Sequence, residues 1–574
     1  MPSKQESLDG VMDQETARAA PRGHARTKSN ISIGSNNPSR PKHNRSKSTK
    51  KLDSVYSDEA TIAFIKRTLC APQLAGPEGS RARNIHKPLS ELLPPLTSSN
   101  QVDLQIYALI SIIIKDFVHA WYSRITPDQD FTDQVVHIIA HCTRALEQRI
   151  RAVDLEALIL DELPELINLH VTAYRTAYNG SYTSSLVADP REIYHAINPH
   201  PALTPVPFES GSLASLDQAE NEAVWRQLLI QGVLSHVLPP EDLNNPPLRV
   251  LVTEIFSELI IGRGVCGNIC EGWFICDLIA KLLAILRPPE PDVQQQPPTS
   301  PNRLEQFGLL ADDSDDAEEA PTVTSRSPVD FISKAFWQIM QYAFLAFMTI
   351  RAFFTALSDA ASLPPRANSR EDSTHDELDD SGSLCQQSTH DSIKRPILGM
   401  SLWSCCSHLI SLDLQMPWLT TMGAYIQWLM ICSSWKVGYT NSRLDRLLSH
   451  HIQTKILDPS RLPSILLLIR TNMFPNNSLG PGRVPPTPSE ALAIKTKCAT
   501  AIIAAIPPVV VKQVFAGAGE EEVHRRVEDM LDAFGDAYLN KHLIVGIVDL
   551  VIVKLFPELA EQSISSILKK EDGQ

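Results

Sequence analysis

The sequence has few glycines, no paired-cysteine motif and no apolar stretch at its N-terminus. The polar N-terminus predicts that there is no secretory signal. With 24 glycines beside 42 prolines, the composition favours helices joined by proline-rich linkers over a turn-rich all-β protein. The ten cysteines are scattered, which is typical of a reduced cytosolic protein. The formal net charge of −14 argues against a nucleic-acid-binding protein.

Catalytic motifs with their required context are also missing. Gly262–Gly267 has the G-x-G-x-x-G spelling of a dinucleotide site, but the preceding segment Leu248–Ile261 has helical rather than strand periodicity. We therefore interpret these glycines as a helix C-cap followed by a turn. No G-x-S-x-G, P-loop or kinase pattern is present. The sequence predicts no enzyme activity, no catalytic residues and no cofactor.

Three groups of histidines and cysteines could be mistaken for metal sites. None has the spacing of a zinc module, and their apolar neighbours favour ordinary burial, so we predict no metal site. These groups are His137 with His141, Cys266 with Cys270 and Cys276, and Cys405 with Cys406 and His408.

Composition divides the chain into six segments, of which three lack the apolar residues needed to fold. The segments are a disordered basic, serine-rich tail (1–56), a helical domain (57–287), a disordered proline-rich and acidic linker (288–328), an apolar aromatic helix (329–358), a disordered acidic and serine-rich linker (359–395) and a second helical region (396–574). In the tail, Ser29 and Ser48 each follow an arginine by three residues and are candidate phosphorylation sites. The alternative is a tail that serves only solubility.

Helical periodicity dominates both folded regions. In Val102–Trp121, apolar residues recur at spacings of three and four, which makes one face of a helix. Thr126-Pro127-Asp128 is a typical helix start, and Asp154 can cap the next helix. The predicted fold class is all-α.

Three short blocks in the first region resemble a known family. They are His170–Arg175, Tyr194–Leu203 and Leu238–Leu243. Together they resemble the PXA (PX-associated) domain of the sorting nexins, over about 57–287. In addition, Tyr538–Ile544 and Leu555–Leu559 resemble a divergent C-terminal nexin domain. No PX or RGS domain fits between these regions, so the resemblance implies no phosphoinositide recognition by a PX domain.

The PXA-like blocks also supply a predicted structural junction, in which a proline-stiffened loop docks on a helix. We expect this junction to stabilise the fold and to have no catalytic role. Its residues are His170, Tyr174, Arg175, His195, Pro199 and Leu203.

The resemblance further implies that the two helical regions pack together and line an apolar groove for acyl chains. The sequence alone does not separate such a groove from a filled helical core. The groove candidates are Ile106, Leu109, Ile113, Phe117, Ile544, Ile547, Val548, Val551 and Ile552.

The helix at 329–358 is rich in aromatic residues and has cations near its ends, which favours a membrane interface. Ala335–Ile350 is uncharged but short for a bilayer span, and Leu414–Trp435 is interrupted by polar residues, Pro417 and Gly423. The range 329–435 is nevertheless a candidate for a membrane-embedded segment, and the alternative is that the helix plugs a groove. The interface candidates are Phe336, Trp337, Phe344, Phe347, Phe353 and Phe354.

These features lead to one functional hypothesis and one alternative. The hypothesis is a cytoplasmic protein that binds, and can transfer, phospholipids on the surface of endosomal, vacuolar or endoplasmic reticulum membranes. The alternative is a non-enzymatic trafficking scaffold that recruits other proteins and has no lipid cavity.

Overall fold

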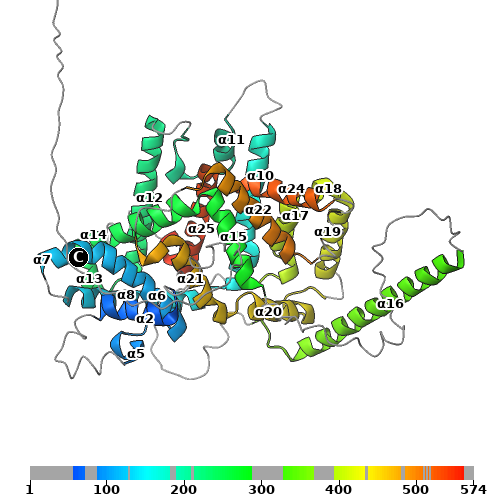
Figure 1. The fold of residues 1–574 in the computed structure, drawn as a ribbon, viewed down its shortest axis with the longest axis horizontal. Coiled ribbons are helices and arrows are strands. Elements are labelled where there is room, and N and C mark those ends of the chain that lie inside the picture. The colour runs from blue at the N-terminus through cyan, green and yellow to red at the C-terminus, as the bar shows by residue number, and fades with distance from the viewer. Residues whose placement is uncertain are drawn as a thin grey trace, which may run out of the picture. The chain divides into compact units, whose positions relative to one another are not determined.

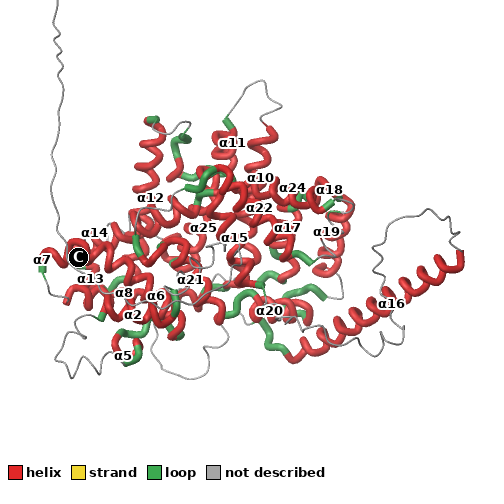
Figure 2. Tube along the Cα trace, in the orientation of Figure 1, coloured by secondary structure: helices red, strands yellow, loops and turns green. Residues whose placement is uncertain are grey.

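The computed structural model describes residues 56–70, 87–126, 130–180, 189–207, 212–287, 328–366, 394–432, 437–479, 485–507, 511, 515 and 519–561. Every regular element within these residues is a helix, which confirms the all-α prediction (Figure 2). The tail with Ser29 and Ser48 lies outside the described residues, as do nearly all of the first predicted linker and most of the second.

The first region is built from α-helices interrupted by π-helical turns. The helices are α2 (Asp58–Leu69), α5 (Leu89–Leu92), α6 (Asn100–Ile113), α7 (His119–Ile125), α8 (Asp130–Ala152), α9 (Leu155–Ala157), α10 (Leu163–Gly180), α11 (Pro190–Ile197), α12 (Leu213–Val237), α13 (Pro240–Leu243), α14 (Pro246–Glu254) and α15 (Gly272–Leu286). The π-helical turns are η1 (Ile114–Val118), η2 (Leu158–Glu162) and η4 (Ile255–Ile269), and η3 (Pro201–Leu203) is a 3₁₀ turn. Asp154 caps α9 as predicted, since its side chain accepts a hydrogen bond from the amide of Ala157.

The remaining helices follow the first linker, beginning with one long helix (Figure 1). They are α16 (Pro328–Asp359), α17 (Leu402–Leu409), α18 (Leu412–Gln415), α19 (Pro417–Cys432), α20 (Arg443–Lys455), α21 (Leu462–Met473), α22 (Pro488–Ala505), α24 (Glu520–Leu531), α25 (Ala537–Leu555) and α26 (Pro557–Glu561). The short 3₁₀ turn η5 (Ala360–Ser362) lies at the start of the predicted second linker, and η6 (Ile397–Gly399) follows that linker. The turn η9 (Asp532–Phe534) precedes α25.

The two helical regions share hydrophobic cores, as predicted. Tyr538 and Leu539 of α25 pack in one buried cluster with Tyr194 and Leu203. In a second cluster, Val545 packs among residues of α12 and η4. A helix near the C-terminus is thereby part of the core of the first region.

Buried polar contacts join the same two regions elsewhere. The guanidinium of Arg470, on α21, is fully buried and lies 3.1 Å from Oγ1 of Thr61 and 3.3 Å from Oε1 of Gln105. Lys541 of α25 lies 2.8 Å from Oε2 of Glu222 on α12. Such contacts fix the register between helices that are hundreds of residues apart in the sequence.

The glycine-rich segment Gly262–Gly267 is not a turn, so that interpretation was wrong. It lies within η4, in continuous helix after α14. A Cβ on Gly264 would lie 2.5 Å from Cε of Met473, and one on Gly262 would lie 3.3 Å from Nε of Arg226. The glycines allow neighbouring side chains to approach the helix closely, which sequence periodicity does not reveal.

Candidate membrane-binding surface

Helix α16 is a continuous helix of 32 residues. The helix begins at Pro328, a position at which the missing amide hydrogen of proline is tolerated. No glycine or proline occurs between Pro328 and Pro364-Pro365. One stretch within the described residues, Ile339–Ser362, is long and apolar enough to cross a membrane, with a mean hydropathy of 1.4. Its residues are exposed up to Thr355, and burial begins only at its C-terminal end, where Ala360 is fully buried.

All six predicted interface residues on α16 are exposed. The exposed fractions range from 45% for Phe353 to 70% for Trp337. Single exposed apolar residues are common on proteins, but a continuous exposed apolar stretch marks an interaction surface.

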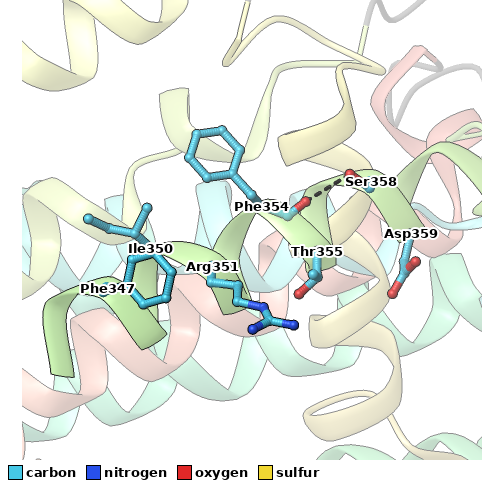
Figure 3. Close-up of a pocket in the computed structure, with 7 residues that line it drawn as sticks. All are labelled: Phe347, Ile350, Arg351, Phe354, Thr355, Ser358 and Asp359. Carbon is cyan, nitrogen blue, oxygen red and sulfur yellow. Dashed lines mark hydrogen bonds between the residues drawn. The ribbon is translucent and has the colours of Figure 1, made fainter. Parts of the chain in front are cut away.

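Helix α16 carries one uninterrupted apolar stripe, which is exposed except at the half-buried Leu357. Its positions alternate at spacings of three and four, so they share one side of the helix. We call this the α16 stripe, and its residues are Phe336, Ile339, Ala343, Ala346, Ile350, Phe353 and Leu357. Arg351 lies outside the stripe, and Figure 3 shows the side chains of Phe354 and Arg351 extending to different sides of the helix. The hollow drawn there runs along this one helix and is open to solvent.

The uncharged section of α16 is shorter than the stretch Ile339–Ser362 and shorter than a bilayer core is thick. This section, Ala335–Ile350, has 16 residues. At 1.5 Å per residue this section is about 24 Å long, while the hydrocarbon core is about 30 Å thick. The other sides of α16 are mixed, with polar Gln341 and Thr355 beside the exposed apolar Trp337, Leu345 and Met348.

A buried ion cluster attaches the C-terminal end of α16 to the rest of the protein. Arg366, shortly after the helix, is 7% exposed and lies 2.8 Å from Oε2 of Glu156 and 3.0 Å from Oδ2 of Asp445. Its amide donates to Oδ1 of Asn441 at 2.7 Å. Sequence reasoning missed Arg366 because it falls at the start of the predicted linker 359–395. The only signal was its place after Pro364-Pro365.

Helix α19 carries a second group of exposed aromatic residues. Trp418, Tyr425 and Trp428 are 59 to 64% exposed, and the rings of Tyr425 and Trp428 stack with centroids 6.0 Å apart. The described part of the segment Leu414–Trp435 is not one continuous helix, because Met416 separates α18 from α19 and Pro417 begins the second helix.

The predicted junction residues lie at contacts between the two helical regions. His170 is fully buried, with Nδ1 2.8 Å from the hydroxyl of Tyr194 and Nε2 3.0 Å from the carbonyl oxygen of Ala533. Because a carbonyl only accepts, Nε2 carries the proton and Nδ1 accepts from Tyr194. Neutral His170 therefore has a hydrogen-bond partner at both of its ring nitrogens. In a separate contact between the regions, Nδ1 of His195 lies 3.4 Å from Nε2 of His542.

The other junction residues have varied environments. Arg175 donates to the carbonyl oxygens of His408 and Leu409 at 2.6 and 3.2 Å, which places a cation at the C-terminal end of α17. The carbonyl of Leu203 accepts from the hydroxyl of Tyr538 at 2.7 Å. Tyr174 stacks near Tyr178, with ring centroids 4.5 Å apart. Pro199 is exposed.

The buried histidines are expected to make stability depend on pH. Burial lowers the pKa of His170 to about 4, and burial with neighbouring histidines lowers the pKa of His542 to about 3. The unfolded chain, with histidine pKa near 6.5, binds protons first as the pH falls. The free energy of unfolding should therefore fall between pH 6.5 and pH 4, by about 3 kcal/mol for His170 alone.

Urea unfolding across this pH range measures the effect. The wild type is compared with His170→Gln, which removes one titrating group and leaves the carboxylates unchanged. The variant should lose less stability on acidification than the wild type does. Equal losses in both proteins would contradict the role given to His170.

The nine groove candidates are all half-buried, and they lie on helices with different neighbours. Helix α6 packs mainly on α2 and α21, whereas α25 packs mainly on α10 and η4. Ile106 and Phe117 lie against a buried cluster that includes Ile65 and Tyr107. The remaining groove candidates on these two helices are Leu109, Ile113, Ile544, Ile547, Val548, Val551 and Ile552. That the two faces enclose one groove stays a prediction.

Within the described residues, no group of three or more histidine, cysteine or acidic side chains is arranged to hold a metal. Cys266 and Cys270 are buried. Burial raises the pKa of the Cys266 thiol to about 12, which disfavours the thiolate form that binds metals.

Comparisons with known proteins support one part of the resemblance. The PXA domain model matches residues 99–282. The chain is similar to PXA domain protein 1 of Schizosaccharomyces pombe, with 28% identity over 153 residues, which are 26% of this chain and 28% of that protein. It is also similar to sorting nexin-14 of Danio rerio, with 19% identity over 158 residues, 28% of this chain and 16% of that protein.

The matched region is therefore less than a third of each of these relatives. No solved structure matches the chain. The resemblance of the C-terminal region to a nexin domain stays a prediction. Residues 99–282 therefore match the PXA domain model, and the chain is distantly similar to PXA domain protein 1 and to sorting nexin-14.

Proposed function

We propose that this protein is a non-enzymatic lipid-binding protein that attaches to the cytosolic surface of endosomal, vacuolar or endoplasmic reticulum membranes. The observation that carries the proposal is the α16 stripe, an exposed apolar surface on a helix whose end is attached through a buried ion cluster. The PXA domain and the similarity to a sorting nexin support a role in membrane trafficking.

Burial of the α16 stripe in a membrane surface would contribute a large favourable free energy to attachment. Phe336, Ile339, Ile350 and Phe353 are large and exposed. Full burial of each such side chain contributes about 1.5–3 kcal/mol, so even partial burial of four of them offsets much of the unfavourable entropy of association. The test is vesicle flotation with full-length protein, in which wild type should float and a variant with a disrupted stripe should not.

Lipid binding in a groove between the helical regions is the second part of the proposal. We expect Val548→Trp to block a hollow groove without unfolding the protein, so that lipid co-purifying with the wild type is lost. If the space is instead filled, the larger side chain should destabilise the protein by about 1–3 kcal/mol. Mass spectrometry of extracted lipid and urea unfolding are measured on the same samples.

Val553 provides a matched control because it lies on the same helix and is 43% exposed. Val553→Trp should change neither lipid content nor stability. Loss of stability in Val548→Trp, together with no lipid in the wild type, would contradict a hollow groove.

A trafficking scaffold is the second candidate function, and the spacing within the α16 stripe favours it. Alternation at three and four residues also suits packing against a partner helix. Crosslinking of α16 to a protein in the absence of membranes, with no flotation on vesicles, would support the scaffold and contradict membrane attachment.

A further inference from the structure

A cleft of about 400 Å³ lies between α17 and α19, outside the PXA domain. Leu398 of η6 and Leu412 at the start of α18 also line the cleft. The large apolar side chains that line it are Leu398, Trp403, Leu412, Leu419, Ile426 and Met430. Its size is at the lower end of the range for small-molecule pockets, about 300–1,000 Å³, which suits one hydrocarbon chain better than two.

The polar side chains that line the cleft are those of Ser404, Ser407, His408, Thr420 and Gln427. No lysine, arginine, aspartate or glutamate lines it. Ser407 does line it, and its hydroxyl oxygen is buried without a hydrogen-bond partner in the described part of the chain. A buried hydroxyl in this state is unfavourable unless a ligand completes its hydrogen bonding.

Hydrogen bonds hold the walls of the cleft to each other and to the rest of the protein. Arg175 binds the carbonyls at the end of α17, and Nδ1 of His408 lies 2.7 Å from Oδ1 of Asn168. At the start of α17, Ser401 donates to Oδ1 of Asp161 from both its amide and its hydroxyl. The side chain of Gln427 on α19 donates to the carbonyl of Leu398. A cleft with fixed walls loses little conformational entropy when a ligand enters.

We propose that this cleft binds the hydrocarbon chain of an uncharged lipid, whose ester or hydroxyl oxygen hydrogen-bonds to Ser407. An anionic head group would find no lysine or arginine in the lining, and a peptide would leave most of its backbone groups unsatisfied in so apolar a cleft. The proposal rests on the proposed function in one respect, because the membrane would supply the lipid. The exposed Trp418, Tyr425 and Trp428 on α19 would lie at the membrane surface beside the opening.

Binding is measured with full-length protein and monooleoylglycerol delivered from cyclodextrin, so that no bilayer is needed. Oleate carries the same chain with a charged head group and is the comparison ligand. The wild type should bind one monooleoylglycerol, and oleate should bind at least tenfold more weakly.

Three variants locate the site. Gly423→Leu fills the cleft from a position where a built Cβ meets nothing within 4 Å, and leucine is a better helix former than glycine, so the fold should be kept. This variant should bind at least tenfold more weakly. Ser407→Ala should weaken binding about threefold to tenfold by removal of one hydrogen bond. Thr421→Leu adds the same side chain on α19 outside the lining and should bind as the wild type does.

Unchanged binding in Gly423→Leu, or an equal loss in Thr421→Leu, would overturn the site. Oleate binding as tight as that of monooleoylglycerol would overturn the ligand class, and full binding by Ser407→Ala would overturn the role of the hydroxyl. Monooleoylglycerol binding without vesicle flotation would contradict only the proposed function, and flotation without monooleoylglycerol binding would contradict only the cleft.

Discussion

Replacement of Ile339, Ile350 and Phe353 by aspartate is expected to lower the affinity for vesicles at least a hundredfold. The three side chains are exposed and share the α16 stripe. Each contributes about 1.5–3 kcal/mol when fully buried, so loss of all three, with three charges added, exceeds the 2.7 kcal/mol that corresponds to a hundredfold change. The free energy of unfolding should stay the same, because no core packing is lost. Flotation across a series of lipid concentrations measures the affinity.

A matched variant separates apolar contact from simple charge repulsion. Gln341, Ala352 and Thr355 lie on α16 outside the stripe and are exposed. Their replacement by aspartate adds the same three charges, and it should weaken binding far less. Equal losses in both variants would assign the effect to repulsion, and wild-type flotation of the first variant would contradict membrane attachment through the stripe.

The largest expected effect on stability is that of Arg366→Met. Glu156 and Asp445 are buried around this guanidinium, and both would be left without their cation. Removal of one partner from a buried ion cluster typically costs about 3–5 kcal/mol, because the remaining charges stay desolvated. Urea unfolding at pH 7 measures the loss in free energy of unfolding, and the unfolding transition should begin at a lower urea concentration.

Two further variants make this measurement specific. Arg351→Met removes an exposed arginine from α16 and should change stability by less than about 0.5 kcal/mol. Arg366→Met combined with Asp445→Asn should recover part of the loss, because one unpaired carboxylate is removed. A loss in Arg366→Met no larger than that in Arg351→Met would show that the cluster does not stabilise the attachment of α16.

The positions of helices with clear local periodicity or composition were predicted closely. The periodicity in Val102–Trp121 corresponds to α6, η1 and α7, and the aromatic helix predicted at 329–358 corresponds closely to Pro328–Asp359. The resemblance supplied the PXA domain, which composition and periodicity could not.

The remaining features depend on contacts between distant parts of the chain. Gly264 lies in a helix at a point where Met473 packs too closely to leave room for a Cβ, and no residue near Gly264 in the sequence indicates that contact. Arg366 is buried because two carboxylates from other helices surround it. The cleft between α17 and α19 depends on how two short helices are held, and the unpaired hydroxyl of Ser407 has no sequence signature.

The sharing of a core between the PXA helices and α25 has a consequence for synthesis on the ribosome. The last helix of the first region ends at Leu286, and α25 begins at Ala537, so 537 − 286 = 251 positions separate them. At a translation rate of roughly 5–20 residues per second, about 13–50 s pass between synthesis of the first region and synthesis of the helix that completes its core. During that time, the apolar surface that Tyr538, Leu539 and Val545 later cover is available to chaperones. A chain truncated before α25 should therefore remain chaperone-bound, and a separately made C-terminal segment supplied in trans would release it.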